Sequence, residues 1–426
     1  MRAVKPALGR SFASLSVPNY RRYFFGQIVS QSGTWMQTVG ELWLVLTLTG
    51  SAVAVGITTA LQFTPILLFG AWAGVLADRM DKRKLLIYTQ TAMAIPALVL
   101  WVLAASGIVE SWMVFAVVFA RGAVNAFDNP ARQSFVVELV GPRRVVNAVG
   151  LNSAIVQCAR VAGPALAGIV IATAGVSTAF LINAISFIAM IVALRGMRAE
   201  ELERNEPTPR RSGQLRSAVR YVRATPRLYI PLMLTAVVGT LSFNFQTLLP
   251  LLARFTFHGH AGTYAALTTA MGVGALVGAL MASARPTVGP RLLVAAAAMF
   301  GAMLLAAASA PDLVLEVVVL AFTGAASVTF ASSVNSFLQL NVRPSMRGRV
   351  MALYSVVFLG SNPIGGPLMG WIAGTAGPRM GLLVGAAAAL ASAVVARGAF
   401  ARMPAEELEQ RREESPVARD LRPVTS

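Results

Sequence analysis

Residues 73–87 read AGVLADRMDKRKLLI, and in this stretch six charged side chains stand between two long apolar runs. Apolar runs of roughly 20 residues recur along almost the whole chain, and each is long enough to cross a hydrocarbon core of about 30 Å as an α-helix. Of the 426 residues, 56% are hydrophobic and 13% are charged, whereas soluble domains carry about 25% charged residues. The chain is therefore predicted to be an all-α integral membrane protein, with the charged stretch in a loop outside the bilayer.

The apolar windows predict twelve transmembrane helices. They are expected at 23–48, 52–77, 84–105, 112–138, 146–173 and 177–197 in the first half, and at 228–253, 262–284, 290–309, 312–340, 347–374 and 379–400 in the second. They define an N-terminal arm (1–22), a six-helix bundle (23–197), a linker (198–227), a second six-helix bundle (228–400) and a tail (401–426). In the linker, Leu215, Val219 and Val222 recur at helical spacing among arginines, which indicates a short helix on the membrane surface.

The arginines and lysines predict how the chain is oriented. With twelve spans, both termini and every even-numbered loop lie on one side of the membrane. Of the 36 basic residues, only Arg254 and Arg379 fall in loops of the other side, and Arg121 and Arg160 fall within spans. Basic loops stay in the cytoplasm, so both termini are expected there. Because the basic residues are scattered over short loops, the net charge of +18 does not predict a nucleic-acid partner.

The two halves of the chain match one another at an offset of about 202 residues. The matches are Gly122-Ala123 with Gly324-Ala325, Ser134-Phe135 with Ser336-Phe337, and Pro142 with Pro344. Their common order indicates that a six-helix unit has been duplicated. Because six is an even number, both copies enter the membrane in the same orientation. Secondary transporters use such parallel repeats to rock around a site at mid-membrane.

The charged loop resembles a known transporter motif. GVLADRMDKRK, residues 74–84, resembles the loop-two motif of the major facilitator superfamily. The segments NYRRYFFGQ (19–27), DNPARQSF (128–135) and ARVAGPALAG (159–168) look like its enterobactin-exporter and macrolide-efflux branch. The resemblance covers nearly the whole chain. It implies the major facilitator fold, twelve helices in two six-helix pseudo-repeats, in a monomer of the bacterial inner membrane.

The resemblance also implies a gate that latches the two halves on the cytoplasmic side when the cavity faces outward. Asp78 is expected to dock near Gly348 at the start of the eleventh span, and Arg79 to pair with Glu138 at the foot of the fourth. The full set of expected gate residues is Gly74, Asp78, Arg79, Arg83, Glu138 and Gly348. The alternative is that the basic residues of this loop only hold it in the cytoplasm.

Four ionisable side chains fall within predicted spans of the first half: Glu41, Arg121, Asp128 and Arg160. An ionised side chain in the bilayer costs about 2.5–3.5 kcal/mol or more, so each is a candidate functional residue. At about 1.5 Å of rise per residue, Glu41 is expected at the depth of Arg121, and Asp128 at the depth of Arg160. Arg121 also matches the span-four arginine that is associated with proton coupling in the family. Whether these two pairs couple protons to transport or only brace the bundle stays open.

Amide and aromatic side chains in the spans are candidates for a substrate cavity, because they combine stacking area with orienting hydrogen bonds. The candidates are Gln31, Trp35, Gln62, Asn125, Asn152, Gln157, Phe243, Asn244, Gln246 and Asn335. The single cysteine, Cys158, is expected to be a small buried packing residue.

Two functions are compatible with these features. The first is a proton antiporter that exports an amphipathic small molecule, such as a siderophore or a macrolide-like drug, by rocker-switch alternating access. The second is a proton-independent facilitator, or a mover of lipids or lysophospholipids. The sequence contains no enzyme constellation and no P-loop of the form G-x-x-x-x-G-K-[ST]. We therefore expect no enzyme activity and no cofactor, with the proton gradient as the energy source.

Overall fold

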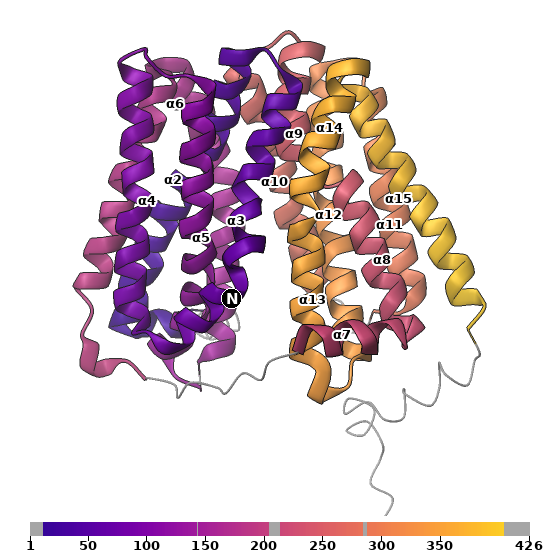
Figure 1. Cartoon of the computed structure of the whole chain (residues 1–426), viewed down its shortest axis with the longest axis horizontal. Helices are drawn as coiled ribbons and strands as arrows, with labels where there is room; N and C mark the ends of the chain where they lie inside the picture. The colour runs from indigo at the N-terminus through magenta and orange to yellow at the C-terminus, as the bar shows by residue number, and fades with distance from the viewer. Residues whose placement is uncertain (1–11, 143, 204–213, 284–287, 404–426) are drawn as a thin grey trace, which may run out of the picture.

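The structure is a computed structural model that describes residues 12–142, 144–203, 214–283 and 288–403. All regular secondary structure of these residues is helical (Figure 1). The all-α class predicted from the apolar runs is therefore confirmed. Half of the predicted N-terminal arm, most of the tail and part of the predicted linker lie outside the described residues.

The first half of the chain forms five long helices. They are α2 (Pro18–Thr49), α3 (Ala52–Arg79), α4 (Lys82–Ala105), α5 (Ser111–Val140) and α6 (Val145–Arg195), preceded by the short η1 (Ala13–Ser16). The predicted spans 146–173 and 177–197 both lie in α6. They meet at Gly175, whose backbone has φ 83° and ψ 165°. Because a side chain rarely tolerates positive φ, a glycine at this position lets the chain reverse without a longer loop.

The linker and the second half form shorter pieces. They are η2 (Ala199–Glu201), α7 (Gln214–Arg223), α8 (Pro226–Leu241), α9 (Phe245–Leu251), η3 (Leu252–Thr256), α10 (Ala261–Ser283), α11 (Pro290–Ser309), α12 (Leu313–Asn341), η4 (Pro344–Met346), α13 (Arg347–Gly360), α14 (Asn362–Ala376) and α15 (Pro378–Ala401). The seventh predicted span is interrupted between α8 and α9, and the eleventh is interrupted at Ser361. The helix expected in the linker is α7, which lies across the ends of the long helices (Figure 1).

Eight helices of the described residues are long and apolar enough to cross a membrane. The predicted spans 146–173 and 177–197 share one of them, and the eleventh span is divided between α13 and α14, each too short to cross alone. The helical ranges thus follow the predicted spans, while the count of twelve crossings stays a prediction.

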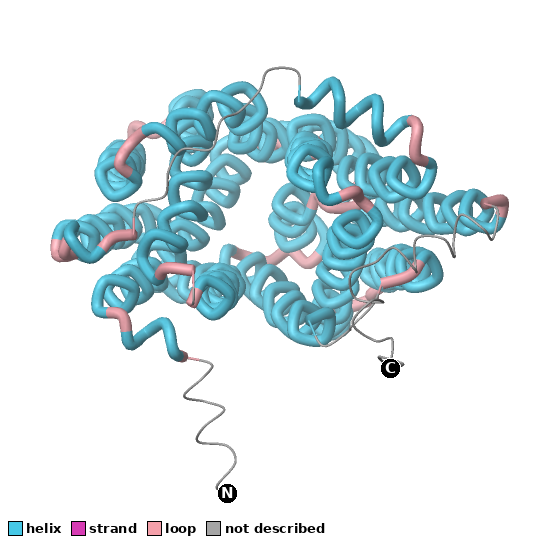
Figure 2. The backbone as a smooth tube through the Cα atoms, turned by 90° about the horizontal axis from the view of Figure 1, so that it is seen from below, coloured by secondary structure: helices cyan, strands magenta, loops and turns pink. Residues whose placement is uncertain are grey.

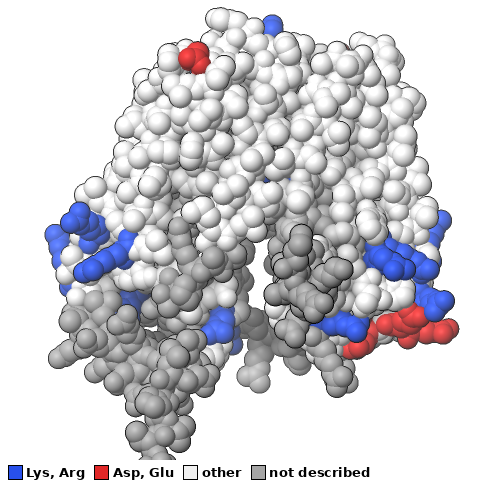
Figure 3. Space-filling view, turned by 180° about the vertical axis from the view of Figure 1, so that it is seen from behind, with Lys and Arg blue, Asp and Glu red and all other residues white. Residues whose placement is uncertain are grey.

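The surface between the two ends of the molecule is apolar. Large apolar side chains stand outward there, among them Trp72, Val314 and Val394, which are 78%, 76% and 72% exposed. The space-filling view shows almost no charged residue in this band, whereas basic residues gather at its lower margin (Figure 3). In water such a surface would drive aggregation, but in a bilayer it faces lipid.

We call the end of the molecule that carries Arg21, Arg22, Lys84, Arg220 and Arg223 the basic end, and the opposite end the far end. Helices α2 to α6 form one half, and helices α8 to α15 form the other (Figures 1 and 2). Between the halves, α3 packs against α14 and α6 packs against α10.

The two halves touch at the far end and separate toward the basic end. A Cβ atom added to Gly56 of α3 would lie 2.3 Å from the carbonyl oxygen of Gly366 in α14. Nearby, the hydroxyl groups of Thr247 and Thr59 are hydrogen-bonded at 3.1 Å. At the basic end the surface is notched between the halves (Figure 3). The molecule is therefore closed at its far end in this conformation.

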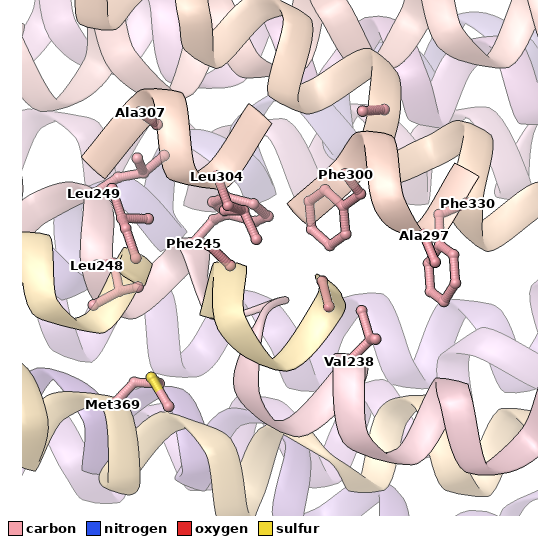
Figure 4. Packing of buried hydrophobic residues seen from close by; sticks show 14 of the residues in the cluster. Val238, Phe245, Leu248, Leu249, Ala297, Phe300, Leu304, Ala307, Phe330 and Met369 are labelled. Carbon is pink, nitrogen blue, oxygen red and sulfur yellow. The ribbon is translucent and has the colours of Figure 1, made fainter. Parts of the chain in front are cut away.

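The largest buried core lies in the second half, where aromatic rings pack between α8, α11, α12 and α13. The ring centroid of Phe243 lies 4.9 Å from that of Phe300 and 5.3 Å from that of Phe358. Phe300 also stacks on Phe330 at 6.3 Å, and Phe245 lies beside them (Figure 4). These rings pack around the interruption between α8 and α9 and hold it in place by apolar burial.

Candidate functional site

A buried ion pair joins α2 to α5 in the first half. Glu41 and Arg121 are 1% and 4% exposed. Arg121 donates through Nη2 to Oε2 of Glu41 at 2.6 Å and through Nε to Oε1 at 3.2 Å. Gln37 donates to Glu41 Oε1 at 2.7 Å and accepts from Asn183 of α6. The sequence-based pairing of Glu41 with Arg121 is thus present, and both carboxylate oxygens are hydrogen-bonded, as a buried charge requires.

A second buried carboxylate, Asp128, lies closer to the basic end. Its Oδ1 accepts hydrogen bonds from Thr89 at 2.7 Å and from Gln90 at 2.9 Å, both on α4. Its Oδ2 pairs with Arg132, one turn further along α5, where Nη2 lies 2.5 Å away. Arg132 also donates to Gln27 of α2. The network therefore ties α2, α4 and α5 together through one carboxylate and one guanidinium.

The predicted pair of Asp128 with Arg160 is not formed. Asp128 and Arg132 are four residues apart on one helix, so their side chains are neighbours whatever the tertiary structure. Arg160 instead lies over the ring of Trp35, with its guanidinium carbon 5.1 Å from the ring centroid. Asp128 and Arg160 were expected at a similar depth in the membrane, but the Asp128 side chain contacts Arg132 and the Arg160 side chain contacts Trp35.

The gate region also differs from its prediction. Glu138 pairs with Lys82 at 2.6 Å, and both side chains are buried. Arg79, the partner expected for Glu138, is exposed. Arg83 donates to the carbonyl oxygens of Leu194 and Arg195 at 2.7 and 2.8 Å, which fastens the loop to the end of α6. The ion pair at the foot of α5 thus exists, with lysine in place of the expected arginine.

The contact expected between Asp78 and Gly348 is not tested by the described side chains. Gly348 is exposed, and a Cβ atom at this position would meet nothing within 4 Å. Gly74 is buried within α3, and the side chain of Asp78 lies outside the described residues. The latch between Asp78 and the start of the eleventh span therefore stays a prediction.

The expected cavity residues are of two kinds. Phe243 packs against the apolar core of the second half, and Asn244 is buried and donates to the carbonyl oxygen of Thr240 at 2.7 Å. Phe243 is partly exposed and the Oδ1 of Asn244 has no hydrogen-bond partner, so their assignment to a substrate cavity stays a prediction. Asn335 accepts a hydrogen bond from Gln339 at 2.6 Å. The remaining candidates are partly exposed: Gln31, Trp35, Gln62, Asn125, Asn152, Gln157 and Gln246.

Three further features were missed or misjudged from sequence. Arg132 was not among the expected site residues, although its i, i+4 spacing from Asp128 signals the pair. Glu316 of α12 was not among the expected site residues either, yet it is 0% exposed and neither carboxylate oxygen has a hydrogen-bond partner. Cys158, expected to be buried, is exposed; its position inside an apolar span is equally compatible with a lipid-facing surface.

The resulting site is a column of buried charge in the first half. It holds two carboxylates, each bound by an arginine, and a third arginine stacked on tryptophan at the level between them. Carboxylates can take up and release protons, and arginines remain charged. The arrangement is suited to moving protons and binding a small molecule. Among the described residues, no group of three or more histidine, cysteine or acidic side chains is placed to hold a metal ion.

Solved transporter structures share this fold. The nucleoside transporter NupG superposes with a TM-score of 0.70 at 13% sequence identity, covering 90% of this chain and 100% of that one. A bacterial homologue of the human lysosomal transporter Spinster, in an inward-facing and unoccupied conformation, gives a TM-score of 0.68 at 15% identity, covering 90% and 96%. At these identities the likeness shows that the chain shares the fold of these proteins.

The family model described as transmembrane secretion effector, a family of major facilitator transporters and not of enzymes, matches residues 9–423. The chain belongs to this family. It is 28% identical to the staphyloferrin A transporter of Staphylococcus aureus over 266 residues, and this aligned segment covers 61% of this chain and 66% of that protein. It is 24% identical to macrolide efflux protein A of Streptococcus pyogenes, over 80% of this chain and 85% of that protein. The multidrug efflux pump Tap of Mycobacterium bovis is 26% identical, over 89% and 92%.

Proposed function

We propose that the protein exports an amphipathic small molecule in exchange for protons, by alternating access between its two halves. The family and the relatives named for siderophore transport, macrolide efflux and multidrug efflux support export of a small molecule. The single observation that carries proton exchange is the buried Asp128 network, in which one carboxylate binds two groups of the neighbouring α4 and the arginine one turn along its own helix.

Protonation of Asp128 would change the contacts between helices. The carboxylate holds Arg132 by an ion pair, and Arg132 in turn donates to Gln27 of α2. A proton on Asp128 removes the negative charge that stabilises this arginine, so the hydrogen bonds among α2, α4 and α5 must rearrange. Proton binding is thereby linked to helix movement, which is the link that an antiporter needs.

We propose that the basic end faces the cytoplasm of a bacterium, because basic residues concentrate on that side of inner-membrane proteins. The conformation described is then closed to the outside and open toward the cytoplasm, where an exporter loads its substrate. The partners of the protein are its small-molecule substrate and the lipid bilayer, and the working unit is the monomer, whose two halves enclose one central path.

A proton-independent facilitator, or a mover of lipids or lysophospholipids, is the second candidate. It is favoured by the complete hydrogen bonding of Glu41, whose two oxygens are held by Arg121 and Gln37. A carboxylate with all of its partners in place can serve as a brace between helices without ever releasing or binding a proton. The two candidates differ in whether a pH gradient drives flux.

The test uses everted membrane vesicles made acidic inside, with a macrolide and a siderophore as substrates. Wild type, Asp128→Asn and Glu41→Gln are compared with Glu110→Gln, a control that neutralises an exposed acid at the far end. Gradient-driven uptake that is lost in Asp128→Asn and kept in Glu110→Gln supports antiport. Flux that does not depend on the pH gradient and is unchanged in Asp128→Asn and Glu41→Gln supports the facilitator.

A further inference from the structure

Arg160 is a cation at the middle of the membrane, and no acid among the described residues forms an ion pair with it. It lies near the middle of the part of α6 that precedes Gly175, about 15 residues and therefore roughly 22 Å from the helix start at Val145. Its Nε atom is buried and has no hydrogen-bond partner. Its one recorded interaction is the stacking of its guanidinium on Trp35 of α2, at 5.1 Å.

The acids of the surrounding spans are engaged elsewhere. Glu41 is bound by Arg121, Asp128 by Arg132, and Glu138 by Lys82. Glu316 lies in the second half near the far end, in the first turn of α12. Among the described residues of the spans, no carboxylate forms a salt bridge with Arg160. Arg160 is partly exposed and its Nε is buried without a hydrogen-bond partner, so a partner that comes from outside the chain would be favoured.

Arg160 also lies where the two halves meet. The carbonyl oxygen of Arg160 would be 3.0 Å from a Cβ atom added to Gly272 of α10, in the opposite half. On the same faces, Gln157 precedes Arg160 by one turn of α6, and Gln31 precedes Trp35 by one turn of α2; both are partly exposed. A cation, an aromatic face and two amide groups therefore come together at mid-membrane beside the boundary between the halves.

We propose that Arg160, stacked on Trp35, binds an oxyanion of the substrate, so that the exported molecule carries a carboxylate or phosphate group. The guanidinium supplies two parallel N–H donors for such a group, and Trp35 holds the guanidinium plane in place. Gln157 and Gln31 supply the neutral hydrogen bonds that orient the rest of the ligand. This inference rests on the proposed transport function and names its substrate class: a free carboxylate compound or a lipid with an anionic headgroup.

The test measures binding to the purified full chain in detergent, with three probe classes. The probes are a carboxylate siderophore together with citrate, lysophosphatidylglycerol, and a macrolide that has no acidic group. Arg160→Gln is compared with Arg160→Lys, which keeps the charge, and with Arg220→Gln, which removes an exposed arginine at the basic end. Because Arg160 has no acid to leave unpaired, Arg160→Gln is expected to fold, and its thermal unfolding midpoint without ligand checks this. Trp35→Leu is a second variant that removes the stacking partner and keeps the charge.

We expect that an anionic probe binds about tenfold or more weakly to Arg160→Gln than to the wild type. Binding should partly recover in Arg160→Lys and should be unchanged in Arg220→Gln. Which anionic probe binds tells a free carboxylate from a lipid headgroup. The proposal is overturned if no anionic probe binds the wild type, or if binding is equal in Arg160→Gln.

The outcome is separable from the outcome for the transport proposal. If gradient-driven export of the macrolide is unchanged in Arg160→Gln and no anionic probe binds, the antiporter proposal stands and the oxyanion-site proposal is overturned. If an anionic probe binds in a manner that depends on Arg160 but no gradient-driven flux is seen, the oxyanion-site proposal stands and the antiporter proposal is overturned.

Discussion

At the scale of residues, buried charge is organised by which neighbours can complete its hydrogen bonds. Glu41 and Asp128 each have an arginine and at least one amide group within reach, so their charges are compensated inside the bundle. Arg160 and Glu316 are the exceptions, since neither takes part in a salt bridge among the described residues. Glu41 and Asp128 are candidates for bracing the bundle or exchanging protons. Arg160 is a candidate for ligand binding, and Glu316 is a residue whose substitution is expected not to destabilise the protein.

Arg132→Gln is expected to destabilise the protein strongly, because it leaves Asp128 buried without its counter-charge. Removal of one partner from a buried pair costs about 3–5 kcal/mol. The measurement is the thermal unfolding midpoint of the purified protein in detergent. The double variant Asp128→Asn with Arg132→Gln should recover part of the loss, since no charge then remains unpaired. A double variant as unstable as the sum of the two single ones would show that the pair does not interact.

Glu316→Gln is expected to leave the unfolding midpoint unchanged or to raise it. Both oxygens of Glu316 lack hydrogen-bond partners, and the nearby Arg379 donates to the carbonyl oxygen of Ala310 at 2.5 Å. Replacing a buried carboxyl by an amide of similar shape therefore removes a costly group and breaks no bond. Glu41→Gln is the matched comparison and should lower the midpoint, because it leaves Arg121 uncompensated. An equal loss in both variants would mean that Glu316 has a partner in solution.

At the scale of elements, the second half is built from interrupted helices and the first half from long ones. The interruptions between α8 and α9 and at Ser361 are held by packing, as Phe243 and Asn244 show. Contact between the halves depends instead on small residues, which let the backbones of α3 and α14 approach closely at the far end. The far-end closure is therefore sensitive to a single methyl group.

Gly56→Ala is expected to open the far end. The added Cβ atom would lie 2.3 Å from the carbonyl oxygen of Gly366, a contact that only separation of α3 and α14 relieves. The measurement is labelling of a cysteine placed at Thr59 by a thiol reagent, in a Cys158→Ser background, which should rise severalfold. Gly150→Ala is the control, because its Cβ atom would meet nothing within 4 Å. Equal labelling in the two variants would contradict a closure formed by α3 and α14.

At the scale of the whole molecule, an apolar band separates a basic end from a far end with few charges (Figure 3). The two halves meet at the far end, through α3 with α14 and α6 with α10. Alternating access requires these contacts to break while the basic end closes. Orientation in the membrane decides which of the two movements loads the substrate.

We expect the basic end to face the cytoplasm. In a Cys158→Ser background, a cysteine at Gly107, between α4 and α5 at the far end, should react in intact cells with a membrane-impermeant maleimide. A cysteine at Arg220 on α7 should react only after the cells are opened. Both positions are exposed, so a difference reports sidedness and not burial. The reverse pattern would place the basic end outside and overturn the proposed direction of export.

The sequence by itself determined the class of the molecule and the course of its helices. Apolar length and loop charge are local properties, so the twelve ranges, the linker helix and the family resemblance could all be read without knowing any contact. Depth arithmetic along the helices also predicted that Glu41 meets Arg121, since both lie on helices that are neighbours in the bundle.

Only the tertiary structure decided which faces of the helices meet. Depth states how far along a helix a residue lies but not the direction in which it points, and so Asp128 was assigned to Arg160 when Arg132 stands beside it. For the same reason, Lys82 rather than Arg79 reaches Glu138. The stacking of Arg160 on Trp35, which carries the proposed oxyanion site, depends on α2 and α6 packing side by side, a contact between distant parts of the chain that no local pattern records.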